Sequence, residues 1–243
     1  MARSRRKFAR NHQSSWLYGR HAVRAMLEGS HWRAEEVLAA EPETVEPVAG
    51  DVPVVPTDPA RIAELVKTDD HQGLAARMPP YPYAAASDLC GVERVLILDR
   101  VQYPMNFGTM IRSAEVFGVG DVLIGSVGQC EVTASVARMS VGAVFRCRVA
   151  RCERLADGVR TLREDGIRVL AATLAESTPC HELDLTGRCG IVIGRESDGV
   201  SPDVLAECGG RVLIPQAGQT QSLNAAASAA VLLYEMSRQR AAG

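Results

Sequence analysis

The chain has 243 residues, of which 47% are hydrophobic and 23% are charged, and its formal net charge is −2 at pH 7. This length fits one large domain or two smaller ones, and this composition excludes a disordered protein. No apolar run approaches the ~20 residues needed to cross a bilayer, and no apolar signal-peptide core follows the N-terminus, so we expect a cytoplasmic protein with no membrane partner. The seven cysteines include no C-x-x-C pair, which argues against a disulfide framework or a zinc site.

Charge is distributed unevenly along the chain. The first eleven residues carry five basic side chains and no acidic one, which leaves 22 basic and 29 acidic residues in the remainder. We therefore expect a basic, disordered arm over residues 1–14. Such an arm is either a solubilising tail or a segment that contacts RNA phosphates, and the charge alone does not decide between them.

Residues 15–78 are predicted to form a small α/β domain. The helical spacing of apolar residues from Trp16 to Leu27 predicts a first helix that ends at Gly29. Short strands are expected at 37–40 and 52–55, a helix at 58–67 with Asp58 as its cap and Pro59 in its first turn, and a strand at 71–77. Residues 79–90 begin with three prolines in four residues, which predicts a linker.

Residues 91–243 alternate between strand and helix patterns. Strands are expected at 94–98, 121–124, 144–150, 167–172, 190–193 and 212–214, and helices at 106–117, 153–164 and 222–240. This alternation predicts a second α/β domain with a mostly parallel sheet that is covered on both faces. The fingerprint G-x-G-x-x-G is absent, which argues against a nicotinamide-binding Rossmann enzyme.

Three segments of this domain combine strand ends with polar loops. In the first, a Pro-containing loop after Leu98 opens a helix for which Asn106 is a good cap. The apolar stripe of that helix leaves Arg112 on another face. Arg112 is either a functional cation or half of an ordinary surface pair with Glu115.

The second segment follows the buried strand 190–193. That strand delivers Gly194 and Glu196 to its carboxyl end, where open α/β sheets bind their ligands. The alternative is a plain capped turn, because Ser201 and Pro202 make a good helix start.

The third segment runs from Leu213 to Asn224, where a polar loop interrupts a strand and leads into an Ala-rich helix. Such a junction suits ligand binding, since a helix N-terminus presents unpaired N–H groups. The alternative is a connecting loop that Ser222 caps.

Taken together, these segments resemble the SpoU/TrmH family of RNA ribose 2′-O-methyltransferases, within the SPOUT superfamily. The residues that match the three motifs of this family are Leu98, Asp99, Val101, Pro104, Asn106, Gly108 and Arg112, then Gly194, Glu196 and Gly199, and finally Ile214, Pro215, Gly218, Ser222, Leu223 and Asn224. The chain departs from the family pattern at Tyr103, where Asp is usual, at Gln216, where Met is common, and at Ala225 and Ala226, where Val and Ser are usual.

The N-terminal domain is similar to the ribosomal-protein-like RNA-recognition domain of this family. The similarity rests on residues 18–23 and 71–73. It points to the branch that methylates 23S ribosomal RNA, and it implies RNA contacts by Arg20 and His71, with Arg5 and Arg6 of the basic arm. A structural role is the other expectation for His71.

The resemblance also implies a fold, a cofactor and an assembly. It implies a deep trefoil knot in the C-terminal domain, a homodimer with its sites at the subunit interface, S-adenosylmethionine as methyl donor and no metal. The family pattern assigns the cofactor contacts to Gly194, Ile214, Leu223, Ser222, Asn224 and Thr173. The five histidines form no spaced ligand cluster, so a metal hydrolase has no support.

The resemblance gives Arg112 the role of activating the ribose 2′-hydroxyl, with Asn106 and Glu196 holding Arg112 and the loops. A guanidinium stays protonated at neutral pH, so we expect Arg112 to orient the nucleotide and to stabilise developing charge while the proton leaves to water or phosphate. The alternatives are a tRNA-directed enzyme or a resistance-type ribosome methyltransferase of the same family, and a non-catalytic RNA-binding protein.

Overall fold

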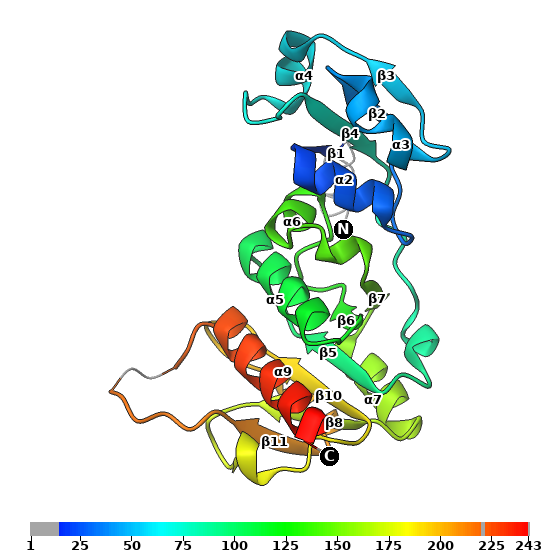
Figure 1. Ribbon diagram of the computed structural model, residues 1–243. Coiled ribbons are helices and arrows are strands. Elements are labelled where there is room, and N and C mark those ends of the chain that lie inside the picture. Colours follow the sequence, from blue (N-terminus) through cyan, green and yellow to red (C-terminus); the bar gives the residue numbers. More distant parts are fainter. Residues whose placement is uncertain (1–14, 220–221, 243) are drawn as a thin grey trace, which may run out of the picture. The chain divides into compact units, whose positions relative to one another are not determined.

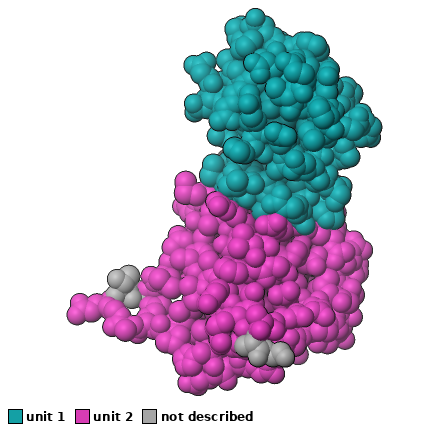
Figure 2. All heavy atoms as spheres, in the orientation of Figure 1, with its two compact units in different colours: residues 1–82, 132–146 teal, residues 83–131, 147–243 magenta. Residues whose placement is uncertain are grey.

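The structure is a computed structural model that describes residues 15–219 and 222–242 (Figure 1). The chain divides into two compact units, coloured separately in Figure 2. Unit 1 combines the N-terminal part of the chain, up to Pro82, with residues 132–146, and unit 2 contains 83–131 and the chain from Cys147 onward. The predicted basic arm, with Arg5 and Arg6, lies outside the described residues.

Unit 1 contains a four-stranded sheet in the order β1 (Ser15–Tyr18), β4 (Leu74–Met78), β2 (Glu36–Ala39), β3 (Val54–Pro56). Only β2 and β3 pair in parallel. The helices of this part are α2 (Arg20–Glu28), α3 (Glu46–Ala49) and α4 (Pro59–Val66), and a 3₁₀ turn covers Pro42–Thr44. The predicted cap of α4 is confirmed, since the Asp58 side chain accepts a hydrogen bond from the Ala60 amide at 2.8 Å.

The prediction of a helix from Trp16 onward is wrong at its start. Residues 15–18 form β1, which pairs with β4, and the helix begins only at Arg20. Between the two elements Gly19 adopts a φ of +94°, a value that favours glycine and ends the strand. Strand pairing therefore overrides the helical spacing at this point.

Residues 132–146 pack within unit 1, although they lie far from its other residues in the sequence. They contain α6 (Ala134–Met139) and a 3₁₀ turn (Ala143–Phe145). The Phe145 ring stacks on Trp32 with centroids 5.6 Å apart, and the Arg138 guanidinium lies 3.9 Å from the centroid of the Tyr18 ring. The predicted strand 144–150 is wrong in its first part, because β7 begins only at Arg148.

Residues 132–146 fall inside the predicted C-terminal domain, so the chain passes between the units at three places rather than through one linker. The domain limits 15–78, 79–90 and 91–243 stay predictions.

Unit 2 is built on a seven-stranded sheet, and the prediction of an α/β fold with a mostly parallel sheet is confirmed. The strand order is β7 (Arg148–Cys152), β6 (Asp121–Gly125), β5 (Arg94–Leu98), β10 (Cys189–Ile193), β8 (Arg168–Ala172), β11 (Gly210–Leu213), β9 (Thr178–Pro179). Every neighbouring pair is parallel. Strands β6 and β7 follow β5 on one side of it, and β10 pairs with β5 on its other side.

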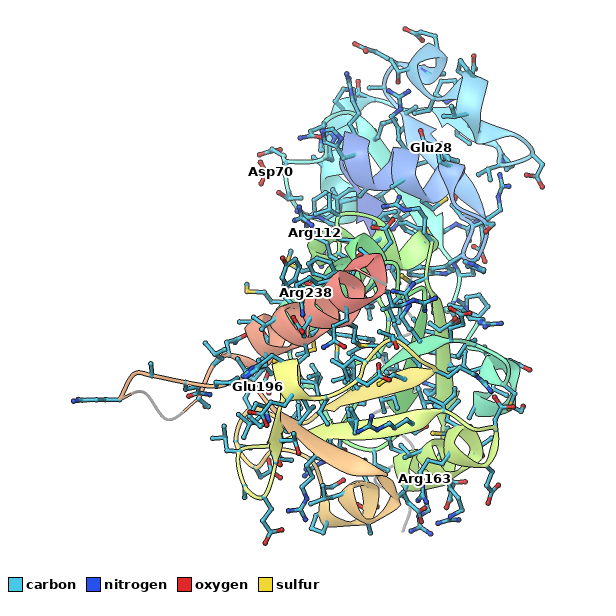
Figure 3. The ribbon with its side chains drawn as sticks, turned by 60° about the horizontal axis from the view of Figure 1, so that its bottom comes forward. Glu28, Asp70, Arg112, Arg163, Glu196 and Arg238 are labelled. Atoms are coloured by element: carbon cyan, nitrogen blue, oxygen red, sulfur yellow. The ribbon has the colours of Figure 1, made fainter. Side chains whose placement is uncertain are left out.

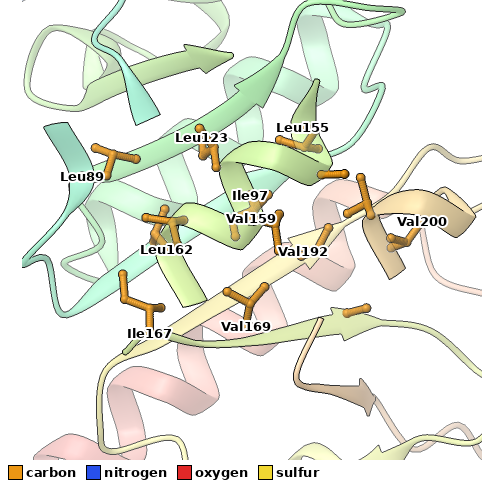
Figure 4. Close-up of a cluster of buried hydrophobic side chains, with 14 of the residues drawn as sticks. Leu89, Ile97, Leu123, Leu155, Val159, Leu162, Ile167, Val169, Val192 and Val200 are labelled. Atoms are coloured by element: carbon orange, nitrogen blue, oxygen red, sulfur yellow. The ribbon is translucent and has the colours of Figure 1, made fainter. Parts of the chain in front are cut away.

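Helices cover both faces of this sheet (Figure 1). The helices are α5 (Pro104–Val116), α7 (Leu155–Glu164), α8 (Pro202–Glu207) and α9 (Ala225–Ala242), with 3₁₀ turns at Ala86–Leu89 and Cys180–Glu182. Figure 4 shows α7 packed against Ile97, Val169 and Val192 of the strands, with α9 behind the sheet. Because successive strand residues point to opposite faces, β5 buries Val95 and Ile97 on the α7 side and Leu96 and Leu98 on the other. Full burial of each such side chain stabilises the fold by about 1.5–3 kcal/mol.

The remaining expectations concern membrane-spanning helices, disulfide bonds and the trefoil knot. No helix among the described residues is long and apolar enough to cross a membrane. The seven cysteines are all free, and only Cys90 is exposed. The trefoil knot stays a prediction.

Candidate active site

A cavity of about 760 Å³ lies at the carboxyl ends of β8, β10 and β11. Four segments line it: residues 172–175 after β8, residues 193–200 after β10, residues 212–216 with β11, and the start of α9. In a parallel sheet the carboxyl ends of neighbouring strands meet at one edge, which is where such folds bind small molecules. The volume lies within the range of about 300–1,000 Å³ that is typical of ligand pockets.

A tight turn after β10 forms one wall of the cavity. The Arg195 amide donates to the Gly199 carbonyl at 3.1 Å, and the Gly199 amide donates back to the Arg195 carbonyl at 2.8 Å. Gly199 has a φ of +66°, and a Cβ atom on Gly194 would meet the backbone of Gly199 and Val200. A close approach of backbone to backbone therefore requires glycine at 194, and the left-handed backbone favours glycine at 199.

Glu196 in this turn accepts a hydrogen bond from the Asn106 amide of α5. The expectation that Asn106 caps α5 is wrong, because the helix begins at Pro104 and Tyr103 is its cap residue. Pro104 sets the first turn, and the Tyr103 carbonyl accepts from the Phe107 amide at 3.0 Å. The Asn106 side chain is thus free to join α5 to the turn after β10.

The start of α9 forms the opposite wall. The Asn224 side chain accepts hydrogen bonds from the amides of Ala226 at 2.8 Å and Ala227 at 3.4 Å, so Asn224 caps this helix. The alternative that Ser222 is the cap is wrong, because the helix starts three residues later, at Ala225. Ser222 lines the cavity instead.

The structure brings all six predicted cofactor residues into the lining of one cavity: Thr173, Gly194, Ile214, Ser222, Leu223 and Asn224. Thr173 is held by a hydrogen bond between its hydroxyl and that of Ser177 at 2.8 Å. Leu223 is 43% exposed, so an apolar side chain faces solvent at the rim. Sequence reasoning missed Ser228 and Leu232, which also line the cavity and follow Asn224 at intervals of four residues, the spacing of one helix face.

Arg112 does not belong to this wall. It is exposed on α5, six residues after Asn106, and it makes no hydrogen bond or ion pair with any residue that the structure describes. Figure 3 labels Arg112 on its helix and Glu196 on the loop after β10. The alternative of a surface pair between Arg112 and Glu115 has no ion pair to support it in the described chain.

Charge in the cavity wall comes from Arg195, Glu196 and Asp198. Hydrogen bonds from Ser197 and then Arg100 lower the pKa of the Asp198 carboxyl below its ordinary value of 3.8. Asp198 is therefore ionised at neutral pH. Within residues 15–219 and 222–242, no group of three His, Cys, Asp or Glu side chains could hold a metal ion.

The predicted RNA contacts of unit 1 lie at the end of β1 and the start of β4. Arg20 is exposed, and its amide donates to the Gln72 side chain at 2.9 Å. Arg20 also lines a smaller cavity of about 240 Å³ together with Glu41, Thr44 and Gln72. His71 is only 7% exposed, and its Nδ1 accepts from the Gly73 amide at 3.0 Å, which fits the structural role that we gave as the other expectation.

The chain thus has two units: one with a parallel sheet and a ligand-sized cavity at the carboxyl edge of that sheet, and a smaller α/β unit. Residues 93–234 match the SpoU rRNA methylase family, and residues 16–84 match the substrate-binding domain of RNA 2′-O ribose methyltransferases. The chain belongs to the SpoU rRNA methylase family, a family of RNA methyltransferases. The resemblance inferred from the three motifs is thus confirmed.

Three similar proteins cover both units. An uncharacterized tRNA/rRNA methyltransferase of Synechocystis is 33% identical over 92% of this chain, and the match spans 62% of that protein. The AdoMet-bound rRNA methyltransferase of Sinorhizobium meliloti is 26% identical with a TM-score of 0.82 over 96% of this chain and 90% of its own. The SpoU methyltransferase AviRb of Streptomyces viridochromogenes, in complex with the cofactor AdoMet, is 25% identical with a TM-score of 0.78 over 99% of this chain and 95% of its own.

Proposed function

We propose that the protein transfers a methyl group from S-adenosylmethionine to a ribose 2′-hydroxyl of RNA, with 23S ribosomal RNA as the substrate. The observation that carries this proposal is the single cavity into which residues of the second and third segments converge, with Thr173, at the carboxyl edge of the sheet. The AdoMet-bound relative from Sinorhizobium meliloti supports the cofactor and a ribosomal substrate.

The residues of the cavity fit this cofactor. Gly194, Ile214 and Leu223 offer backbone and apolar contacts, and the cavity has room for a nucleoside with its amino-acid arm. When bound, S-adenosylmethionine supplies an electrophilic sulfonium methyl group. The oxygen–methyl bond forms as the sulfur–methyl bond breaks, the hydroxyl proton leaves to water or phosphate, and S-adenosylhomocysteine remains.

The chemistry asks the protein to position the ribose. Arg112 orients the nucleotide through its ribose or phosphate, because its guanidinium is exposed and makes no hydrogen bond within the described chain. Asn106 and Glu196 hold the start of α5 against the turn that forms the cavity wall. This arrangement keeps α5, which carries Arg112, in a fixed register with the cavity wall of its own chain.

Unit 1 is proposed to hold the RNA. Its match to a substrate-binding domain of RNA 2′-O ribose methyltransferases supports this role. Arg20 provides an exposed cation beside the small cavity, and the stacked pair of Tyr18 and Arg138 lies in the same unit. Arginine and aromatic side chains are the residues on which unpaired RNA bases stack.

A homodimer through α5 and α9 completes the proposal. These helices pack against each other, and they expose large apolar side chains: Tyr103 at 62%, Met105 at 66%, Val231 at 39% and Tyr234 at 53%. Contiguous apolar patches on a protein surface mark association sites. Arg112 is exposed and lies outside the cavity lining of its own chain, and we propose that a second copy supplies it to the site in the dimer.

The function is tested by mapping 2′-O-methylation in ribosomal and transfer RNA from cells with and without the protein. We expect one 23S position to lose its methyl group. A loss confined to tRNA would show the tRNA-directed alternative, and a loss that confers antibiotic sensitivity would show the resistance-type enzyme. In vitro, Arg112→Ala should keep cofactor binding and lose methyl transfer. If the wild-type protein binds RNA but does not bind S-adenosylmethionine, the non-catalytic RNA-binding alternative holds.

A further inference from the structure

One arginine joins the end of β5 to the wall of the cofactor cavity. The Arg100 guanidinium donates to the Asp198 carboxylate at 2.6 Å, to the Gly199 carbonyl at 3.1 Å and to the Asp99 carboxylate at 3.2 Å. Asp198 and Gly199 line the cavity, whereas Arg100 does not. The contact therefore reaches the cavity from behind its wall.

Asp99 binds the other end of the loop that contains Asp198 and Gly199. Asp99 is only 3% exposed, and its carboxylate accepts a hydrogen bond from the Ser201 amide at 2.6 Å. Asp99 and Arg100 are consecutive residues directly after β5, and together they bind residues 198 to 201. A buried carboxylate needs such partners, because an unpaired charge in the interior is costly.

Backbone hydrogen bonds tie the two ends of the turn 195–199 together. Arg195 and Gly199 exchange two such bonds, so the position of Gly199 is coupled to that of Arg195. The Arg195 side chain adds a hydrogen bond to Gln102 at 3.0 Å and an ion pair with Asp198 at 3.7 Å. Arg100 therefore contacts the same turn that carries Glu196, the residue that accepts a hydrogen bond from Asn106.

The backbone of Arg100 indicates that its side chain is what the position needs. Its φ is +61°, in the left-handed region that only glycine adopts without cost. A strained non-glycine residue persists where the surrounding contacts determine it. The guanidinium supplies those contacts, since its fork of donors reaches three acceptors and its side chain is only 26% exposed.

An ordinary exposed ion pair would not have this effect, because such pairs contribute little to stability. Arg100 differs because it bridges two segments 98 residues apart in the sequence, and one of them is a wall of the cavity. We propose that Arg100 is a positioning residue that holds the loop 194–201 in the shape that binds the cofactor. This inference rests on the proposed function, since it takes the cavity as the cofactor site.

The test is a double-mutant cycle on the affinity of the full chain for S-adenosylhomocysteine, measured by calorimetry. Arg100→Gly removes the guanidinium and relieves the left-handed backbone, so it is not expected to harm folding. We expect it to weaken binding at least tenfold. Asp198→Asn should weaken binding less, and the double variant should bind no worse than Arg100→Gly, because the contact between residues 100 and 198 is already absent in that variant.

Rescue and control variants separate positioning from stability. Arg100→Lys keeps the charge but not the fork of donors, so it should recover part of the lost affinity. The control is Arg160→Ala, which breaks a 2.6 Å ion pair with Glu207 between α7 and α8 that does not line the cavity. It should leave affinity unchanged. The temperature of unfolding of Arg100→Gly without ligand should stay well above the temperature of the binding assay, although Asp99 loses a cationic partner.

Two results would overturn the inference. One is an affinity of Arg100→Gly within twofold of wild type, and the other is an equal loss of affinity in Arg160→Ala. If wild-type protein itself fails to bind S-adenosylhomocysteine, the proposed function fails with it. If wild-type protein binds and Arg100→Gly binds as tightly, only the role of Arg100 fails.

Discussion

The Asn106 side chain donates its amide hydrogen to the Glu196 carboxylate, across 90 positions of sequence. This bond joins the first turn of α5 to the wall of the cavity, and α5 also carries Arg112. In the proposed dimer the methyl donor binds in the cavity beside this bond, and Arg112 extends from the same α5 into the site of the partner chain. The bond is therefore expected to keep the cavity wall in register with the helix that serves the neighbouring site.

Exchanging the donor and the acceptor of the Asn106–Glu196 hydrogen bond tests its proposed role. Asn106→Asp places two carboxylates against each other, so the rate of methyl transfer should fall at least tenfold, which corresponds to about 1.4 kcal/mol. Adding Glu196→Gln restores a donor and an acceptor with their direction exchanged, and part of the rate should return. Radioactive methyl transfer to ribosomal RNA measures both. A double variant as slow as Asn106→Asp alone would contradict the proposed role of the bond.

Gly194→Ala should damage the cavity wall. The new Cβ would meet the backbone of Gly199 and Val200, which cannot turn aside as a flexible side chain can. Overpacking of this kind costs about 1–3 kcal/mol, and we expect at least a tenfold loss of affinity for S-adenosylmethionine. The matched control is Gly187→Ala, since a Cβ there has nothing within 4 Å. Calorimetry of both variants checks the prediction, and equal affinities for the two would refute it.

The parallel sheet and the three motif segments could be predicted from the sequence, because buried strands read as continuous apolar runs with polar loops at their ends. The residue that caps α9 could not be predicted from the sequence. Ser222 and Asn224 are both good caps, and only the observed start at Ala225 selects Asn224. The contacts of Arg100 were also missed, since Asp198 lies 98 residues away and no local pattern links them.

Unit 1 shows a second kind of limit. The sequence of residues 132–146 reads as part of the C-terminal domain, yet Arg138 lies over Tyr18 and Phe145 stacks on Trp32. These pairs join segments more than 100 residues apart. Packing between distant aromatic and basic side chains leaves no periodic signal along the chain, so its partners emerge only from the tertiary structure.

Stability should fall in acid through Glu235. Hydrogen bonds from Arg238 and then Gln239 lower the pKa of the Glu235 carboxyl from 4.5 to about 2, against the opposing effect of burial. Because the native pKa lies below the unfolded one, the stabilisation is present above about pH 4.5 and is lost as the pH falls toward 2. Screening at the half-exposed Arg238 limits it to about 1–3 kcal/mol.

The free energy of unfolding at pH 6 and pH 3, from urea titration, measures this contribution. Other paired carboxylates also titrate in this range, so the comparison is between wild type and Glu235→Gln. The variant should be less stable at pH 6 and should lose less stability between the two pH values. Equal losses in both proteins would show that Glu235 does not contribute.

The apolar surface of α5 and α9 predicts a homodimer that a single charge can break. Met105 is 66% exposed on the first turn of α5, and Met105→Lys places a charge in the proposed interface, where an unpaired buried charge is costly. We expect the mass in solution, measured by light scattering after size exclusion, to change from two chains to one.

Val127→Lys is the matched control. Val127 is 75% exposed in the loop after β6, so this variant should leave the dimer intact. Because Arg112 is proposed to act in the site of the partner, the monomeric variant should keep S-adenosylhomocysteine binding but lose methyl transfer. A wild-type protein that is monomeric at micromolar concentration and still active would contradict both the dimer and the shared site.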